Sequence, residues 1–177
     1  MPLLPIDDPE GVLLQVPFVS EQPYVELCWA ACCEMIFRSY GRNNVTLCRM
    51  ASEASGLNCC PDPSSKACDQ PHWPGDILRN HGFSFLRSRS ALTLANILYE
   101  INCKRPVMAV LEWLGADGSD EGRHMIVVAG YYPNCDLLVN DPLKGQARLG
   151  YDYVNAAYNL GRWAESYYNL TPFNDTF

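Results

Sequence analysis

The spacing of apolar residues changes along the chain, and this change limits the folds that the chain can adopt. Between residues 28 and 101, apolar side chains recur every three or four residues within several segments, which is the period of amphipathic helices. After Pro106, short runs of β-branched and aromatic residues are separated by turn residues, which is typical of strands. Helices followed by an antiparallel sheet predict an α+β fold. We expect one domain over residues 1–177, because the sequence shows neither an internal repeat nor a linker.

Caps and turn residues place the individual elements. The first helix is expected at residues 28–40, where apolar residues are dense enough for a buried element and Gly41 can end it. The other expected helices are 46–54, 73–82, one that begins after the capping residue Thr93, and a short one within 151–160. The expected strands are 107–113, 124–132, 137–140 and 163–170, with a hairpin turn at 133–136. Residues 1–22 contain prolines and no helical period, so we expect an extended N-terminal arm.

Charge and hydropathy argue against several classes of partner. The chain has 13 Lys and Arg residues against 20 Asp and Glu residues, a net charge of −7, and no basic cluster. We therefore expect neither nucleic acid nor a membrane surface as a partner. No apolar run reaches the roughly 20 residues that cross a bilayer, and the first residues lack the regions of a conventional signal peptide. We also expect the chain to be a monomer.

Nine cysteines in 177 residues suggest an oxidising, extracytoplasmic compartment, reached by a dedicated secretion system or after removal of a leader. If eight cysteines pair, one thiol stays free. Residues 48–74 form a cysteine-rich loop insertion, in which disulfides are favoured over zinc because the adjacent Cys59 and Cys60 cannot easily serve one tetrahedral site. The shortest bridges would join Cys48 and Cys68 to the Cys59-Cys60 pair. Cys32 and Cys33 lie on the expected buried helix and are also compatible with core packing.

Cys28 is the best candidate for a nucleophile. It lies in the first turn of the expected buried helix, where the positive end of the helix dipole stabilises a thiolate. A thiolate that attacks an acyl carbon also needs a base, a group that orients the base and donors for the oxyanion. His124 at the start of one expected strand and Asp141 at the end of the next can meet across a hairpin, and the Gln22 amide can lie beside the Cys28 backbone N–H.

Other residues offer alternatives for these roles. Asp141 precedes Pro142 and could only cap a turn, in which case Asn140 is its nearest substitute. His72 and His81 are expected to be structural. Trp163 is a candidate for shielding the His–Asp hydrogen bond from water. Residues 117–121 are acidic but lack the spacing of a calcium loop, so a solvated turn is expected there.

The ordered set of Gln22, Cys28-Trp29, His124 and Asp141 resembles the papain-like cysteine proteases, in which a Gln lies six residues before a Cys-Trp pair and a His and an Asn or Asp follow. The resemblance covers about residues 16–168 and is greatest to the compact bacterial branch, which includes effector proteases and the peptidase domains of bacteriocin exporters. The strings that carry this finer likeness are Cys28-Trp29-Ala30-Ala31, Gly122-Arg123-His124, Gly130-Tyr131 and Asn140-Asp141-Pro142.

The resemblance implies a papain-like fold, with a central Cys-bearing helix in an N-terminal helical part packed against a C-terminal antiparallel sheet. It also implies roles for four residues: Cys28 as nucleophile, His124 as base, Asp141 as the orienting group and Gln22 in the oxyanion hole. The expected function is a secreted bacterial cysteine endopeptidase that needs neither a cofactor nor a metal. The alternatives are another acyl transfer on the same triad, by an amidase, transglutaminase or deamidase, and an inactive disulfide-scaffolded binding module in which Cys28 is paired or unreactive.

Overall fold

The fold is known from a computed structural model of the chain, and the structure describes residues 10–173. The first nine residues of the expected N-terminal arm lie outside the described residues. The elements in chain order are β1 (Val12–Leu13), α1 (Cys28–Ser39), α2 (Leu47–Ser55), α3 (Pro74–Asn80), β2 (Phe83–Ser88), α4 (Leu94–Asn102), β3 (Val107–Leu114), β4 (Asp120–Tyr131), β5 (Leu137–Asp141), β6 (Gly145–Leu149), α5 (Tyr151–Asn155) and β7 (Gly161–Pro172).

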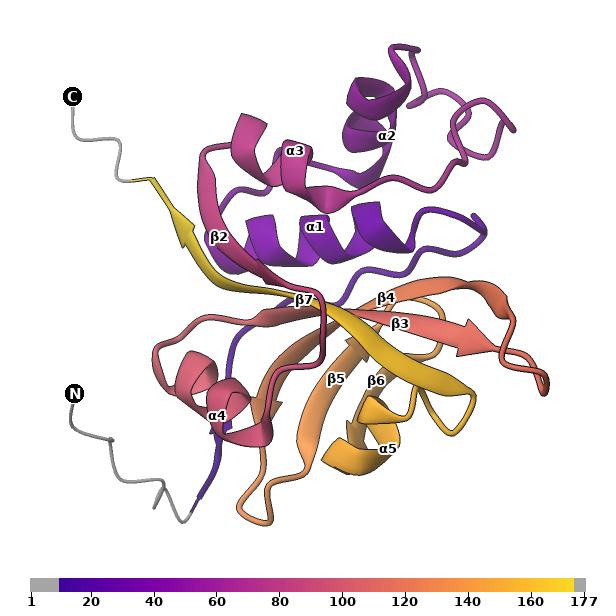
Figure 1. The fold of residues 1–177 in the computed structure, drawn as a ribbon. Coiled ribbons are helices and arrows are strands. Elements are labelled where there is room, and N and C mark those ends of the chain that lie inside the picture. Colours follow the sequence, from indigo (N-terminus) through magenta and orange to yellow (C-terminus); the bar gives the residue numbers. More distant parts are fainter. Residues whose placement is uncertain (1–9, 174–177) are drawn as a thin grey trace.

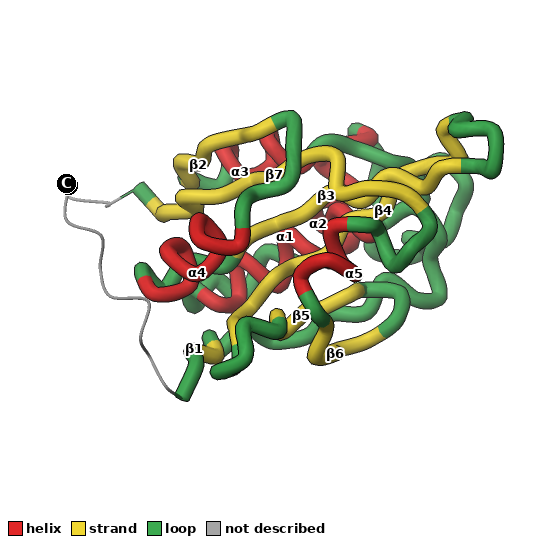
Figure 2. Tube along the Cα trace, turned by 60° about the horizontal axis from the view of Figure 1, so that its bottom comes forward, coloured by secondary structure: helices red, strands yellow, loops and turns green. Residues whose placement is uncertain are grey.

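The described strands form one antiparallel sheet in the order β2-β7-β3-β4-β5-β6, with β1 paired to β4. Figure 2 shows these strands side by side, seen from the side of α4 and α5. In the register of β3 and β4, Leu111 lies opposite His124, and in that of β4 and β5, Val127 lies opposite Asn140. The sheet therefore brings the middle of β4 next to the end of β5, where the two candidate site residues lie.

Both faces of the sheet are covered, which explains why β3 is an almost unbroken apolar run. The helices α1, α2 and α3 lie on one side of the sheet and α4 and α5 on the other (Figure 1). Met108 and Val110 of β3 belong to the hydrophobic cluster that contains α1, whereas the alternate residues Val107 and Ala109 belong to the cluster that contains α4. Successive residues of a strand point to opposite faces, so each face receives its own set.

The helix α1 is the buried element that its apolar density predicts. Its residues from Trp29 to Phe37 are buried, and Gly41 follows its end with a φ of +80°, a conformation that glycine adopts without the cost paid by other residues. Thr93 caps α4 as expected, since its side chain accepts a hydrogen bond from the Asn96 backbone N–H. The first residue of α1 is Cys28, so its position in the first helical turn is confirmed.

The α+β class is confirmed, but a simple division into helices and then strands is wrong. The strand β2 lies between α3 and α4. The short helix expected within residues 151–160 is confirmed as α5, between β6 and β7. Neither β2 nor β6 was expected from the sequence. His124 does not open its strand, because β4 already begins at Asp120. Pairing along the β3–β4 hairpin extends β4 through polar residues that have no strand pattern of their own.

Candidate active site

A cleft of about 290 Å³ separates the start of α1 from the sheet. Its walls come from three parts of the chain. These are the start of α1 together with Glu26 just before it, the end of the cysteine-rich loop, and the strands β3 and β4. The lining residues are Glu26, Cys28, Trp29, Pro71, His72, Trp73, Val110, Arg123, His124 and Met125. Cys28 and His124 thus face the same cavity, one from the helical layer and the other from the sheet.

Cys28 combines accessibility with the surroundings of a reactive thiol. It is partly exposed and is not in a disulfide. As the first residue of α1, it lies at the positive end of the helix dipole, and its backbone N–H has no partner within the helix. A ring nitrogen of His124 and the Cys28 sulfur lie within 4.8 Å of each other, and an imidazolium beside a sulfur favours the thiolate.

His124 and Asp141 form a buried pair. The Nε2 atom of His124 lies 2.7 Å from Oδ1 of Asp141, and the two residues are only 5% and 2% exposed. This hydrogen bond leaves Nδ1 of His124 for Cys28. Burial alone would lower the pKa of His124, but the hydrogen bonds and charges of Asp141 and Cys28 outweigh it and raise the pKa to about 10. The imidazole is therefore held in its protonated form.

Asp141 is held in place by donors on both of its oxygens. Its Oδ1 also accepts hydrogen bonds from the backbone N–H groups of Leu143 and Lys144, at 2.9 and 3.1 Å, and its Oδ2 accepts one from the hydroxyl of Tyr158 at 2.9 Å. Burial would raise the pKa of Asp141, but the hydrogen bonds from His124 and Tyr158 hold it below its usual range. The alternative in which Asp141 only caps a turn is met in part, because its Oδ1 accepts a hydrogen bond from the Leu143 backbone N–H. The same oxygen also orients His124.

Tyr158 is a site residue that the sequence does not reveal. It follows α5 in a run of three residues with positive φ, namely Ala157 at 45°, Tyr158 at 61° and Asn159 at 64°. Left-handed backbone in residues other than glycine costs about 1–2 kcal/mol each, and such strain is often found at functional sites. Here the run carries the Tyr158 hydroxyl to Asp141.

Trp113, and not Trp163, covers the His–Asp pair. The Trp113 ring is stacked on the His124 ring with a centroid distance of 5.9 Å and an interplanar angle of 17°. The expectation for Trp163 is therefore wrong: its indole N–H donates to the Glu165 carbonyl, and its ring belongs to the cluster of α4 and α5. An aromatic face over the imidazole limits the access of water to its hydrogen bond.

Beside Cys28 and His124 the structure places the buried side chain of Glu21, whereas the expected oxyanion donor, Gln22, is exposed. The side chain of Gln22 is exposed, whereas Glu21 is only 2% exposed. The backbone N–H of Glu21 donates to the Pro142 carbonyl at 3.1 Å, which ties this segment to the loop after Asp141. Residues 21–24 form a turn that is closed by a hydrogen bond from the Tyr24 backbone N–H to the Glu21 carbonyl at 2.9 Å, and Gln22 lies exposed within this turn.

Glu21 is unusual for a buried acid. Its Oε2 atom has no hydrogen-bond partner in the described part of the chain. Burial raises the pKa of Glu21 to about 7, against the attraction of His124 and with the help of Asp141. One ligand atom each from Glu21, Cys28 and His124 lie within 4.8 Å of one another, which makes this the group within residues 10–173 that could hold a metal ion.

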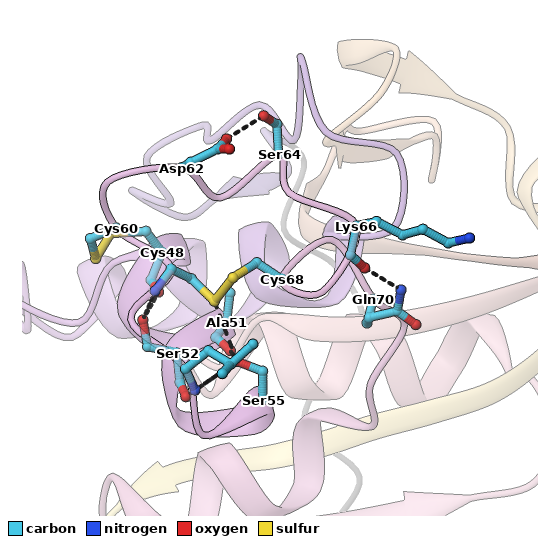
Figure 3. Close-up of a disulfide and its surroundings, with 12 residues drawn as sticks. Cys48, Ala51, Ser52, Ser55, Cys60, Asp62, Ser64, Lys66, Cys68 and Gln70 are labelled. Carbon is cyan, nitrogen blue, oxygen red and sulfur yellow. Dashed lines mark hydrogen bonds between the residues drawn. A yellow bond between two sulfur atoms is a disulfide. The ribbon is translucent and has the colours of Figure 1, made fainter.

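The cysteine-rich loop is closed by two disulfides, Cys48–Cys60 and Cys59–Cys68. Both bridges join the cysteines for which the shortest connection was expected. Figure 3 shows this loop beside α2, with Gln70 bonded back to the Lys66 carbonyl.

The loop also supports the segment that carries Cys28. The carboxylate of Asp69 accepts hydrogen bonds from the backbone N–H groups of Val25 and Glu26, and the Gln70 carbonyl accepts one from the Trp29 indole at 3.0 Å. The loop is therefore part of the site's framework.

The pairing of eight cysteines is wrong. Within residues 10–173, four cysteines pair, and Cys28, Cys32, Cys33, Cys103 and Cys135 are free. Burial in α1 raises the pKa of Cys32 and Cys33 well above the ordinary thiol value, so these two are inert core residues. The alternative of an inactive binding module allowed Cys28 to be paired in a disulfide. Cys28 is free, so that form of the alternative is wrong.

The remaining alternatives lie away from the site's hydrogen bonds. Asn140 is fully buried and donates to the Val16 carbonyl, so the structure does not place it as a substitute for Asp141. His81 is paired with Glu53, and the His72 ring packs on Trp29 at the rim of the cleft. Residues 117–121 lie at and beside the turn between β3 and β4, where Asp117 accepts hydrogen bonds from Ser119.

The comparison with known protein families agrees with this geometry. Within residues 10–173, no helix has the length and apolar character needed to cross a membrane. No curated protein shows a significant match to the chain. A protein-family model matches residues 13–170, and its description is Peptidase C39-like family. This match supports the expected relation to papain-like cysteine peptidases. Because this match covers nearly the whole sequence, the chain belongs to the Peptidase C39-like family.

Proposed function

We propose that this protein is a cysteine endopeptidase of papain-like fold, in which Cys28, His124 and Asp141 hydrolyse peptide bonds through a thioester. The observation that carries the proposal is the arrangement of Cys28, His124 and Asp141 beside an accessible cleft: Cys28 and His124 face each other within 4.8 Å, and His124 is hydrogen-bonded to Asp141. Membership of a peptidase family supports the same reaction class.

In the first half of the reaction, the Cys28 thiolate attacks the scissile carbonyl carbon, and the carbonyl electrons move to the oxygen. The backbone N–H of Cys28 and the positive end of the α1 dipole stabilise this oxyanion. His124 then donates its proton to the leaving amine, the C–N bond breaks, and an acyl thioester on Cys28 remains. Gln22 would join the oxyanion hole only after its exposed side chain turns inward.

In the second half, neutral His124 takes a proton from water, and the resulting hydroxide attacks the thioester. Collapse of the tetrahedral intermediate releases the carboxylic acid and returns the thiolate and the imidazolium. Asp141 keeps Nε2 of His124 protonated and directs Nδ1 to the sulfur throughout, because its Oδ1 accepts the Nε2–H bond in both charge states of the ring. Asp141 thus acts through His124, as a positioning residue.

The cleft beside Cys28 favours a peptide substrate with an apolar side chain next to the scissile bond. Its walls are formed by the side chains of Trp29, Val110 and Met125, while Glu26 and Arg123 supply one charge of each sign. We place the enzyme outside the cytoplasm, as a secreted bacterial protease or effector that works as a monomer. The two disulfides support this location, since disulfides persist in oxidising compartments.

The experiment is digestion of a denatured protein mixture and of a peptide library, with cleavage sites read by mass spectrometry. The purified protein should produce new termini, and Cys28→Ala should produce none. The thioester also predicts an acyl-enzyme, with the mass of the protein plus the substrate minus the leaving group, in wild-type reactions that are quenched with acid at short times. Modification of glutamine side chains without any new terminus would replace the peptidase proposal with deamidation or transglutamination.

A further inference from the structure

The carboxyl group of Glu21 is a buried acid without a protein partner on one oxygen. Its Oε2 has no hydrogen bond in the described residues, and the whole residue is 2% exposed. A buried polar atom that is not hydrogen-bonded destabilises the folded state. Such groups are therefore usually compensated, and buried carboxylates are compensated by cations or metals. A compensating group can contact Glu21 together with Cys28 and His124, because one carboxylate oxygen of Glu21 lies within 4.8 Å of a ligand atom of each of these residues.

We propose that Glu21, Cys28 and His124 form a zinc-binding site. The three residues offer one oxygen, one sulfur and one nitrogen, all of which are ordinary zinc ligands. Their ligand atoms are within 4.8 Å of one another, whereas bonds of about 2.0–2.3 Å to a tetrahedral ion place ligand atoms roughly 3.3–3.8 Å apart. A side-chain movement of about 1 Å closes this difference.

The surroundings of His124 fit a metal ligand. Its Nε2 is committed to Asp141 at 2.7 Å, so the nitrogen that faces Cys28 is Nδ1. A carboxylate that accepts the distal N–H of a histidine ligand fixes the ring and increases its basicity, and it is a regular feature of zinc sites. Asp141 is itself fixed by Leu143, Lys144 and Tyr158. The second layer of the site is therefore already built.

Three protein ligands leave a fourth position for water, and the cleft provides room for it, since Cys28 and His124 both line the cavity. Thiolate and imidazole ligands favour zinc over the harder magnesium and calcium ions. Binding requires Cys28 as thiolate, Glu21 as carboxylate and a neutral imidazole, so it releases protons to the solvent.

Zinc at this site would block peptide hydrolysis, because it occupies the sulfur that attacks and the nitrogen that moves the proton. This consequence rests on the proposed function, whereas the binding itself rests on geometry alone. Zinc would thus be a reversible inhibitor, and Glu21 would be the residue that makes the site tighter than a Cys–His pair.

The test is a zinc titration of the full chain, purified with chelator and then freed of it, in competition with a chromophoric chelator. We expect one zinc ion per chain in the wild type and binding weaker by at least about tenfold in Glu21→Gln, which keeps the size of the side chain but removes a ligand charge. Cys28→Ser and His124→Ala should weaken binding at least as much. Glu26→Gln is the matched control, because it removes a nearby acid of the cleft that is outside the ligand group, and its affinity should equal that of the wild type.

Two results would overturn the zinc site. The first is an equal zinc affinity in Glu21→Gln and the wild type. The second is an equal loss of affinity in Glu21→Gln and Glu26→Gln, because this would indicate attraction by charge alone. His81→Ala tests for adventitious binding at the exposed His81–Glu53 pair, and loss of the zinc ion in this variant would also overturn it. Cobalt provides a second readout, since a sulfur-to-cobalt absorption band should appear and be lost in Cys28→Ser. Hydrolysis is measured separately in chelator, so zinc binding without hydrolysis contradicts the peptidase, and hydrolysis without zinc binding contradicts the zinc site.

Discussion

Replacing Asp141 by asparagine should be far milder than replacing it by alanine, because the structure fixes which end of the amide faces His124. The Oδ1 side receives the backbone N–H groups of Leu143 and Lys144 as well as His124 Nε2. An amide NH₂ cannot replace an acceptor there. The amide of Asp141→Asn must therefore keep its oxygen at this side and point its NH₂ at the Tyr158 hydroxyl, which can turn to accept.

The expected magnitudes follow from the hydrogen bonds that each variant loses. In Asp141→Asn, a charge-assisted bond worth about 1.5–3 kcal/mol becomes a neutral one worth about 0.5–1.5 kcal/mol, and a difference near 1.4 kcal/mol is about tenfold in rate. In Asp141→Ala, the partner of a buried His is removed, which costs about 3–5 kcal/mol, or roughly 10² to 10⁴ in rate.

The assay is kcat/KM for a cleaved peptide as a function of pH, with circular dichroism to verify folding. The protonated imidazole is required and is lost as the pH rises through the pKa of His124, which Asp141 helps to raise to about 10. Asp141→Asn weakens that support, so its alkaline limb should move to lower pH. Equal losses in the two variants, or an unchanged limb in Asp141→Asn, would refute the fixed-oxygen reasoning.

Three further substitutions test separate parts of the site. Tyr158→Phe removes the donor to Asp141 Oδ2 and should lower kcat/KM by about tenfold at most, on the scale of 0.5–1.5 kcal/mol; the neighbouring, more exposed Tyr153→Phe should have no effect, and equal effects would contradict the role of Tyr158. Gln22→Ala should lower kcat/KM less than tenfold because the side chain is exposed, whereas a loss of about 10²–10³ would show that Gln22 does supply an oxyanion donor. Asp69→Ala removes two hydrogen bonds from the segment before Cys28. It should reduce kcat/KM several-fold, while the free energy of unfolding falls by only about 1 kcal/mol. A large loss of stability at normal activity would contradict the supporting role of the loop.

The elements that carry a strong local pattern could be predicted from the sequence. The apolar period and Gly41 define α1 and so place Cys28 at its first turn. The hairpin turn between β4 and β5 brings His124 and Asp141 together, because antiparallel neighbours are joined by short loops. The short spacing likewise predicted that Cys48 and Cys68 pair with the adjacent Cys59 and Cys60, but it did not decide which cysteine joins which.

The features that depend on tertiary contacts could not be predicted. The β6 segment Gly-Gln-Ala-Arg-Leu has no strand pattern, and pairing with β5 makes it a strand. Whether Glu21 or Gln22 points inward depends on the bond between Glu21 and Pro142, 121 residues away in sequence. Tyr158 reaches Asp141 through a left-handed run that no local propensity indicates. No local pattern in the sequence marks Glu21 as a buried acid, because its burial depends on the distant contact with Pro142.

The most direct test of the account is alkylation of the native, non-reduced protein with iodoacetamide at about pH 6, followed by peptide mass mapping. Cys103 and Cys135 are free, partly exposed thiols outside the catalytic group and serve as internal references, whereas Cys32 and Cys33 are buried. The thiolate is the nucleophile, so a thiol that nothing activates reacts slowly at this pH. The account predicts rapid modification at Cys28 alone, lost in His124→Ala. Reaction of Cys28 no faster than that of Cys103 and Cys135, or equal reaction in His124→Ala, would contradict an activated nucleophile at Cys28.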